Sequence, residues 1–456
     1  MLQACFLFLT MATGLQEPSP SFHHQIRPIL QAHCQGCHQP AKSKGGLDLS
    51  DYDALMEGAS GEAVVMPGNA ASSLLMAVVL PFEQEAPAMP PDGPALAAEE
   101  TELLRRWIQA GAKDDTPSSL KRTFDQENPP SYEQAPVLTG LDYSPDGRWL
   151  AVSGYHEVLV HDAAGGGMQA RWIGLSERIQ SLAFSPDGRY LAVTGGSPAR
   201  FGEIQIWQVE SGRLLWSQLI GHDTLFGGSW SPDSKWFAFG CPDNSVRVLE
   251  VPSGEAVLFQ GAHNDWVLGT AFSSDASHLV SISRDRSMKL YKVETDQFID
   301  NITSITPGAL KGGLMAVARH PGRDQLLVGG ADGTPRLYKM YREKKRVIGD
   351  DFNLIRAYQA LPGRIYAVVW EPGGSWLAAA SSAGGKGFLA KYQVDTEQAV
   401  WTAEVEAPVY DLAIQPVRQH LTAACADGRL RIYHREQGKM IESFLPTPKP
   451  QSPSRY

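Results

Sequence analysis

The chain has 456 residues and a formal net charge of −10. This length exceeds what one compact domain usually holds, so we expect two or more domains. The negative net charge argues against nucleic acid or an anionic membrane as the main partner, and it is compatible with a protein partner.

The first stretch, MLQACFLFLTMATGLQEPSP, is a short apolar run followed by small and then polar residues. This pattern is typical of a signal peptide, which we place at residues 1–16 with cleavage near Gly14, although the basic n-region is missing. A frayed apolar N-terminus of a cytosolic protein is the alternative. Cleavage removes Cys5. No later segment is apolar for long enough to cross a bilayer, so we expect an exported, periplasmic protein whose mature chain has no membrane span.

A small helical domain is predicted over residues 18–113, with a helix at each end. The segment SFHHQIRPILQAHCQGCHQP has apolar residues at helical spacing, and Pro28 fits near the start of the helix. The segment AEETELLRRWIQAGA has acidic residues in its first turn, an apolar face and Gly111 to end the helix. The apolar faces consist of Phe22, Ile26, Ile29 and Leu30 in the first helix and Leu103, Leu104, Trp107 and Ile108 in the second.

Residues 34–38 read Cys-Gln-Gly-Cys-His, the C-x-x-C-H signal for attachment of a c-type haem. Each thiol adds to one vinyl group of the porphyrin, and one helical turn separates two sulfurs by about the required distance. His38 then faces the iron as the proximal ligand. Cys34, Cys37 and His38 therefore predict one covalently bound haem c. Attachment needs an exported, reduced apoprotein, which agrees with the signal-like start.

Three other interpretations of the cysteine pair compete with this one. A thioredoxin-type redox pair needs a βαβ context, which this segment lacks. A structural zinc site needs four spaced ligands, and the flanking His33 and His38 are poorly placed to reach one ion together with the pair. A simple disulfide leaves His38 without a role. The remaining cysteines, Cys241 and Cys425, stand in apolar strand-like runs and are expected in the core.

A methionine thioether is the expected sixth iron ligand, since His/Met ligation raises the reduction potential. Met89 in AMPPDGP lies downstream of His38 on a proline-bounded loop before the last helix. Met66 in VVMPGN is the competing candidate, and Met76 in SLLMAVVL is expected in the core of a helix. The metal ligands predicted here are therefore His38 and Met89, with Met66 left open. Lys42 and Lys44 offer a docking rim for an acidic partner, although solvated lysines commonly have no specific role.

Four separated motifs, IRPILQAHCQGCH, PGNAASSLL, MPPDGPAL and LLRRWIQAGA, together resemble the small cytochrome c domain of planctomycete proteins. The resemblance covers nearly all of residues 20–113. It implies haem attachment at Cys34 and Cys37, proximal ligation by His38 and distal ligation by Met89.

Residues 114–135 are polar and proline-rich and predict a linker or an extended strap. From residue 136 to 445 seven units recur at about 40 to 50 residues, the period of propeller blades. LDYSPDGRWLAVSG returns as LAFSPDGRYLAVTGG and GSWSPDSKWFAFG, followed by four weaker copies. Each unit has short alternating strands and a turn of S-P-D-G type. The last unit carries its own outer strand, KMIESFL, so we expect the ring to close without a strand from the linker. The tail, residues 446–456, is expected to be disordered.

These units resemble WD40 repeats, in which a histidine and an aspartate belong to a structural hydrogen-bond network. The fold class is therefore expected to be multidomain: a small all-α cytochrome c domain followed by an all-β, seven-bladed WD40-like propeller. The family marks are His222, His263, Trp207, the turn residues Asp243, Asp285, Asp332 and Asp427, and tyrosines in place of tryptophan at 291, 338 and 433.

Together these patterns predict an exported c-type cytochrome for single-electron transfer, with the propeller as a protein-interaction platform and a redox protein as partner. One alternative is an oxidoreductase whose propeller holds a second cofactor or substrate site, which requires histidines or acids at the propeller axis. Another is a haem-based sensor or scaffold. No catalytic motif is present in the repeats, so an enzyme is not favoured.

Overall fold

The computed structural model describes residues 19–39, 42–83, 85–91, 93–117, 124–165, 167–303, 310–347 and 351–448. The predicted signal peptide, residues 118–123 of the predicted linker and residues 449–456 of the tail lie outside the described residues. The chain divides into two compact units, residues 1–122 and 123–456, and each is described separately.

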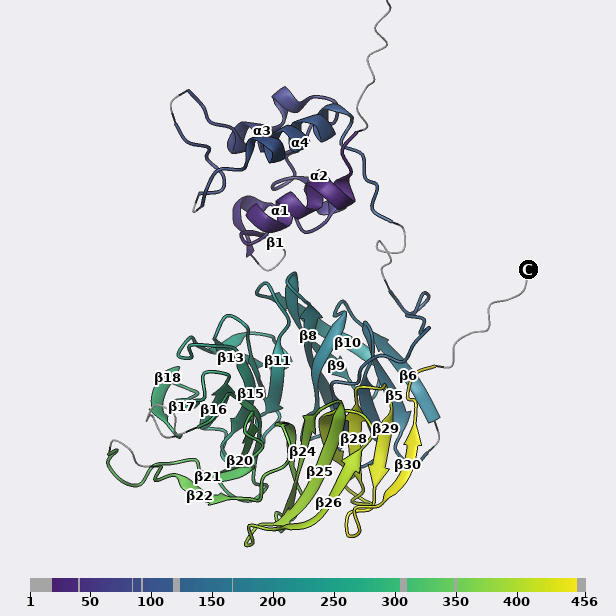
Figure 1. Cartoon of the computed structure of the whole chain (residues 1–456), viewed down its shortest axis with the longest axis vertical. Coiled ribbons are helices and arrows are strands. Elements are labelled where there is room, and N and C mark those ends of the chain that lie inside the picture. The colour runs from purple at the N-terminus through teal and green to yellow at the C-terminus, as the bar shows by residue number, and fades with distance from the viewer. Residues whose placement is uncertain are drawn as a thin grey trace, which may run out of the picture. The chain divides into compact units, whose positions relative to one another are not determined.

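The first unit is built from short helices (Figure 1). A π-helical turn, Phe22–Ile26, leads directly into the first α-helix, and two-residue strands pair with each other after it. The elements are α1 (Arg27–His33), β1 (His38–Gln39), β2 (Lys42–Ser43), α2 (Tyr52–Glu57), α3 (Leu74–Val79) and α4 (Ala98–Gln109), with 3-10 turns at Lys44–Gly46 and Ala70–Ser72.

The core of this unit forms where the two terminal helices meet. Leu104, Trp107 and Ile108 on α4 are buried as the sequence predicts. The ring of Phe22 lies 5.5 Å from that of Trp107, so the segment before α1 packs directly on α4. Gly111, with φ +98°, follows the last turn of α4, a backbone conformation that favours glycine over residues with a Cβ.

The second unit contains seven four-stranded antiparallel sheets, and within each sheet the strands follow chain order. Blade 1 consists of β3 (Leu141–Tyr143), β4 (Trp149–Ser153), β5 (Glu157–Asp162) and β6 (Gly167–Ile173); blade 2 of β7 (Arg178–Phe184), β8 (Tyr190–Ser197), β9 (Phe201–Gln208) and β10 (Arg213–Ile220); blade 3 of β11 (Phe226–Trp230), β12 (Trp236–Gly240), β13 (Val246–Glu250) and β14 (Ala256–Gln260). Blade 4 consists of β15 (Val267–Phe272), β16 (His278–Ser283), β17 (Met288–Lys292) and β18 (Gln297–Asn301); blade 5 of β19 (Leu314–Arg319), β20 (Gln325–Gly330), β21 (Arg336–Lys339) and β22 (Leu354–Ala357). Blade 6 consists of β23 (Arg364–Trp370), β24 (Trp376–Ala383), β25 (Lys386–Gln393) and β26 (Ala399–Val405); blade 7 of β27 (Val409–Ile414), β28 (Leu421–Cys425), β29 (Leu430–Tyr433) and β30 (Met440–Phe444).

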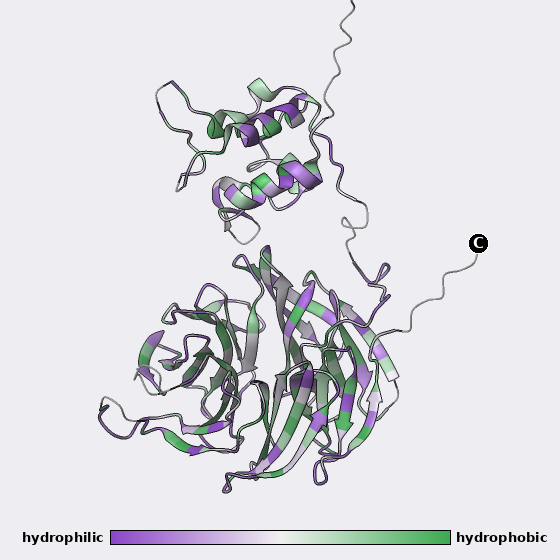
Figure 2. Ribbon diagram, in the orientation of Figure 1, coloured by the Kyte–Doolittle hydropathy of each residue, from purple (hydrophilic) through white to green (hydrophobic). Residues whose placement is uncertain are grey.

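The expected seven-bladed propeller is therefore confirmed, as is the predicted outer strand of its last unit (Figure 1). The second strand of a blade is buried along nearly its whole length, as in β8 and β28, so each sheet buries both faces against its neighbours. Figure 2 shows apolar residues, in green, along the strands of the propeller. Cys241 and Cys425 are buried in this core, as expected.

The turn between the first two strands of a blade is held by a serine and an aspartate. In blade 1 the hydroxyl of Ser144 donates to Asp146 Oδ1 and accepts a hydrogen bond from the backbone N–H of Trp149. The same arrangement recurs in blades 2, 3 and 4, where the serines are Ser185, Ser231 and Ser273. The S-P-D-G repeat therefore encodes a side-chain cap for this turn.

The ring closes by packing and two buried carboxyl groups rather than by exchange of a strand. Asp411 on β27 accepts a hydrogen bond from the backbone N–H of Leu141 on β3, at 2.9 Å. Asp142, the next residue on β3, accepts one from Phe184 on β7, at 2.8 Å. Blades 7, 1 and 2 are thus linked in sequence around the axis.

The expected His–Asp network forms fully in blade 4. His263 Nδ1 lies 2.9 Å from Asp285 Oδ2, and its Nε2 lies 2.7 Å from the hydroxyl of Ser281. In three other blades the turn aspartate instead pairs with an arginine four residues later, a substitution that the sequence analysis missed. The pairs are Asp243–Arg247, Asp332–Arg336 and Asp427–Arg431. These groups are structural.

The second half of the predicted linker, residues 124–135, has no helix or strand and lies against blade 1. Tyr132 is buried, and its hydroxyl donates to the carboxylate of Glu157 at 2.6 Å. Arg171 makes two further hydrogen bonds to Glu157, at 2.6 and 2.7 Å, and one to the carbonyl oxygen of Pro130. This segment is therefore a strap fastened to the propeller.

Candidate functional site

The two cysteines of the C-x-x-C-H motif lie in the turn that follows α1. The helix ends at His33, and the backbone N–H groups of Cys37 and His38 both bond to the carbonyl oxygen of Cys34 at 3.1 Å. This compact turn keeps the two thiols and the imidazole on neighbouring positions of one short segment. Both cysteines are free thiols in the structure.

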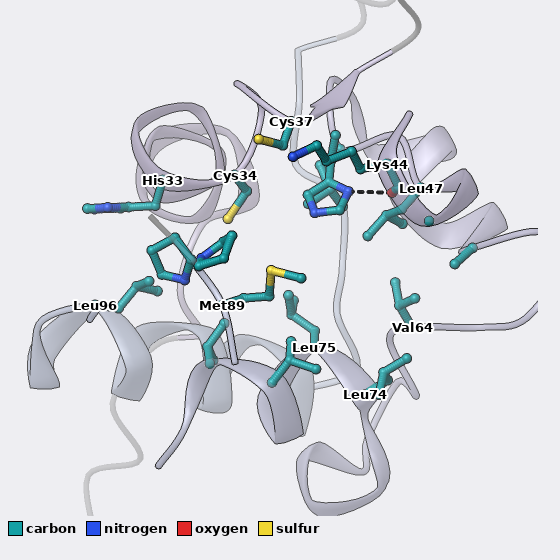
Figure 3. Close-up of a pocket in the computed structure, with 18 residues that line it drawn as sticks. His33, Cys34, Cys37, Lys44, Leu47, Val64, Leu74, Leu75, Met89 and Leu96 are labelled. Atoms are coloured by element: carbon teal, nitrogen blue, oxygen red, sulfur yellow. Dashed lines mark hydrogen bonds between the residues drawn. The ribbon is translucent and has the colours of Figure 1, made fainter. Parts of the chain in front are cut away.

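A cavity of about 380 Å³ opens beside this turn (Figure 3). All four predicted cofactor-binding residues, Cys34, Cys37, His38 and Met89, line it. The rest of its wall is largely apolar and comes from other segments of the unit, including Leu47, Leu49, Val64, Leu74, Leu75, Val78, Val79 and Leu96. A flat, mostly apolar macrocycle with a metal at its centre suits a wall of this composition, because the wall is largely apolar and two thiols, an imidazole and a thioether are available to bond to it.

The imidazole of His38 is oriented by the backbone. Its Nδ1 donates a hydrogen bond to the carbonyl oxygen of Lys44 at 2.9 Å, the dashed line in Figure 3. A proton held on Nδ1 leaves the lone pair on Nε2, the tautomer that a metal ligand requires. The 3-10 turn Lys44–Gly46 places this carbonyl, and no motif of the sequence indicates that contact.

The thioether of Met89 reaches the same cavity from the loop before α4. The backbone N–H of Met89 bonds to the carbonyl oxygen of Val78 at 2.9 Å, which ties this loop to the end of α3. Pro90 and Pro91 follow and also line the cavity. Figure 3 shows the side chain of Met89 pointing toward Cys34.

The other two methionines lie elsewhere. Met66, the competing candidate, is 43% exposed and does not line the cavity. Met76 is buried in the core of the unit, as the sequence predicts.

Burial raises the pKa of the Cys34 thiol to about 11, and the negative charge of Glu100 adds to this effect. The thiol is therefore neutral at pH 7. Glu100 Oε1 lies 3.1 Å from His33 Nε2, a contact between α4 and α1 at the edge of the cavity that the sequence analysis did not identify. A hydrogen bond from the backbone of Ala97 lowers the pKa of Glu100, so this carboxyl group is ionised.

The surroundings of the cysteine pair differ from those that a redox pair or a zinc site requires. The pair follows a helix and precedes strands of two residues each, so it has no βαβ context. Within the described parts of the chain, no group of three or more His, Cys, Asp and Glu side chains is placed to hold a metal ion.

The propeller axis has a second cavity of about 370 Å³, lined by the innermost strands of six blades. Its polar residues include Arg178, Gln180, Tyr366, Tyr410 and Asp411, and no histidine is among the described residues that line it. The oxidoreductase alternative requires histidines or acids that converge at the axis; among the described residues that line this cavity there is one carboxyl group, Asp411, and no histidine. No helix in the described part of the chain is long and apolar enough to cross a membrane.

Comparisons with known proteins agree with this division of the chain. Residues 34–93 match the family described as planctomycete cytochrome C, and residues 171–197, 213–249 and 254–292 match the WD domain, G-beta repeat. These matches include the C-x-x-C-H motif, Met89 and parts of blades 1 to 4.

Three curated relatives show the propeller likeness. Ribosome biogenesis protein WDR12 homolog of Chlamydomonas reinhardtii is 28% identical over 142 residues, 30% of this chain and 32% of that protein. Periodic tryptophan protein 2 of Saccharomyces cerevisiae is 24% identical over 242 residues, 47% of this chain and 25% of that protein. U3 small nucleolar RNA-associated protein 15 homolog of Xenopus tropicalis is 24% identical over 253 residues, 48% of this chain and 48% of that protein.

The chain thus spans less than half of the length of each of these relatives. Sequence, fold and family matches lead to the same conclusion: the protein joins a planctomycete-type cytochrome c domain to a seven-bladed propeller of WD40 repeats.

Proposed function

We propose that the protein is an exported c-type cytochrome that carries one covalent haem for single-electron transfer, and that its propeller is a platform for binding a partner protein. The observation that supports this most strongly is the meeting of two thiols, an imidazole and a thioether in one apolar cavity. These groups come from two segments that lie far apart in the chain, and each is of the chemical type that the haem site needs.

Cys34 and Cys37 would supply the two thioether bonds, and His38 Nε2 and Met89 Sδ would ligate the iron. Haem bound in this way supplies reversible one-electron exchange at its iron. The hydrogen bond to the Lys44 carbonyl holds the His38 ring in one orientation and one tautomer. The apolar wall limits access of water, and a thioether ligand favours a raised reduction potential.

Met89 is the favoured sixth ligand because it lines the cavity, whereas the side chain of Met66 does not. The tether of Met89 to Val78 and the following prolines limit the motion of the loop. Little ordering is therefore needed when the thioether binds a metal.

Export is proposed on chemical grounds together with the signal-like N-terminus. Thioether attachment needs reduced thiols and haem in the same compartment, and c-type maturation takes place outside the cytoplasm. The propeller is proposed as a binding platform because WD40 propellers commonly bind proteins. One curated relative is named for ribosome biogenesis and another for association with a small nucleolar RNA, and neither name identifies a partner for this chain.

The decisive experiment is expression of the full chain in a host that matures c-type cytochromes. We expect the intact mass to include one haem, and the reduced protein to show a c-type spectrum that survives acid–acetone extraction. A Cys34→Ala/Cys37→Ala double variant should lose both signals, while the propeller variant Cys241→Ala should keep both. A chain that matures with no added macrocycle contradicts the proposal.

A further inference from the structure

Most of the net charge of the chain lies on its smaller unit. Residues 19–117 contain 13 Asp and Glu against 6 Lys and Arg, so this stretch carries −7 of the total of −10. The propeller and the remaining residues are nearly balanced. A domain of this size with such an excess produces a negative potential that extends about one Debye length, roughly 10 Å at 0.1 M salt, from its surface.

Exposed apolar side chains of this unit are concentrated in one segment that starts at the wall of the cavity. Its described part has four large apolar residues in the exposed class, and three of them lie within residues 74–82: Leu74 (49% exposed), Leu80 (41%) and Phe82 (72%). We call these three the apolar rim. Leu74 itself lines the cavity, so the rim begins at the cavity wall.

The loop that carries Phe82 starts and ends at the cavity. Val78 and Met89 both line it and are joined by a backbone hydrogen bond of 2.9 Å. Within the loop, the backbone N–H of Glu85 bonds to the carbonyl oxygen of Phe82 at 2.9 Å, which forms a tight turn. Phe82, Glu83 and Glu85 are therefore presented together at the tip, and all three are exposed.

We propose that this tip and the apolar rim are the docking surface for a basic redox protein, one that presents an apolar patch flanked by lysine or arginine side chains. The inference rests on the proposed function and adds the chemistry of the partner. An apolar centre with a charged border is the usual composition of a protein interface, and small interfaces of this kind serve transient electron transfer.

The negative charge around Phe82 indicates that the partner is a basic protein. Glu83 and Glu85 flank Phe82, and no cation lies within residues 74–91. Lys44 is a single positive charge at the cavity, and it is outnumbered by the carboxylates of the unit. Charge complementarity at such a border governs association rate and orientation, so a basic partner is attracted and the acidic partner that Lys42 and Lys44 suggest is repelled.

The test uses the reduced full-length holoprotein and two small oxidants of opposite charge. Tris(phenanthroline)cobalt(III) and hexacyanoferrate(III) each accept one electron from the reduced protein. We expect the rate with the cationic complex to fall with added salt and the rate with the anionic complex to rise. In Glu83→Lys/Glu85→Lys protein the rate with the cation should drop about three- to tenfold at 0.1 M salt, and that with the anion should increase.

Asp53→Lys/Glu57→Lys is the matched control, since it makes the same change of charge on α2, no residue of which lines the cavity. It should change either rate less than twofold at 0.1 M salt. A second readout needs no electron transfer: calorimetric binding of a lysine-rich cytochrome c to the oxidised holoprotein. Phe82→Ser should weaken that binding about threefold or more, because it removes apolar contact without changing charge.

The haem spectrum of each preparation is recorded first. Absence of haem refutes the proposed function itself. Normal haem with rates and binding that do not respond to Glu83→Lys/Glu85→Lys, or that respond equally to the α2 control, overturns only the docking surface. Tighter binding of an acidic protein than of the basic one also overturns it.

Discussion

Nδ1 of His38 donates a hydrogen bond to the carbonyl oxygen of Lys44 across 2.9 Å, which turns the other ring nitrogen, Nε2, into the free electron-pair donor. The acceptor is a backbone atom of a 3-10 turn, so the orientation of the ring does not depend on a second side chain. A ligand held in this way has one tautomer and one direction.

This relationship predicts rescue by a free ligand. His38→Ala protein isolated with haem should lose its low-spin visible spectrum, and added imidazole should restore it by occupying the space that the side chain leaves. His33→Ala serves as the comparison and should keep the low-spin spectrum, because His33 Nε2 is engaged with Glu100. A low-spin spectrum in His38→Ala without imidazole would identify another proximal ligand.

Replacement of Met89 should remove the weak methionine-to-iron charge-transfer band of the oxidised protein and lower its reduction potential. The physical reason is the loss of the thioether, which favours the reduced state. Optical spectra and a redox titration of Met89→Ala measure both effects. Met66→Ala should leave both unchanged, since Met66 lies outside the cavity; the reverse pattern would exchange the roles of the two methionines.

Removal of Glu157 should destabilise the propeller by about 3–5 kcal/mol. Its side chain is 0% exposed and makes two hydrogen bonds with Arg171, so Glu157→Ala leaves a largely buried guanidinium and the Tyr132 hydroxyl without their acceptor. Denaturant unfolding monitored by tryptophan fluorescence measures the loss.

The matched control for that change is Glu404→Ala, which breaks the exposed pair between Glu404 and Lys386 in blade 6. Exposed pairs of this kind contribute about 0–1 kcal/mol. Equal losses in the two variants would show that the contact of the strap with blade 1 contributes little to stability.

The two carboxyl groups at the ring closure predict a pH dependence. Burial raises the pKa of Asp142, and of Asp411, from 3.8 to about 7. Because the folded pKa lies above the unfolded one, these groups stabilise the fold fully below about pH 4, and that stability is lost as pH rises through 7. Their contribution to the unfolding free energy should therefore decrease between pH 4 and pH 7.

Denaturant unfolding at pH 5 and pH 8 of the protein and of Asp142→Asn tests this. From pH 5 to pH 8, the unfolding free energy of Asp142→Asn should fall by about 1–4 kcal/mol less than that of the unsubstituted protein. Buried histidines such as His263 titrate alike in both proteins, so the comparison removes their effect. An identical pH dependence would show that Asp142 is ionised without penalty.

Much of the architecture is predictable because its signals are local and repeated. The S-P-D-G turns recur because a serine hydroxyl and an aspartate cap each turn within a few residues of one another. The face of α4 that carries Leu104, Trp107 and Ile108 follows from helical spacing alone. The arginines that replace histidine in three blades were missed, although an aspartate followed four residues later by arginine marks them in the sequence.

The residues of the candidate site could be predicted from the sequence, but the tertiary contacts that position them could not. Cys34, Cys37 and His38 are close neighbours in the chain, so their spacing indicates their chemistry directly. The choice between Met89 and Met66 depends on which loop folds back to α3, and the hydrogen bond from Met89 to Val78 is a tertiary contact that composition does not reveal. The strap role of Tyr132 likewise depends on Glu157 and Arg171, which come from strands of blade 1.

The amino-acid sequence by itself determined the C-x-x-C-H motif, the sevenfold repeat and the excess of acid in the first unit, since each is a property of neighbouring residues or of composition. Tertiary structure alone decided which methionine faces the cysteines, which carbonyl orients His38, how blade 7 meets blade 1 and where Phe82 is presented. These depend on contacts between separate segments of the chain, and their free energy is set by burial and geometry that only the folded molecule has.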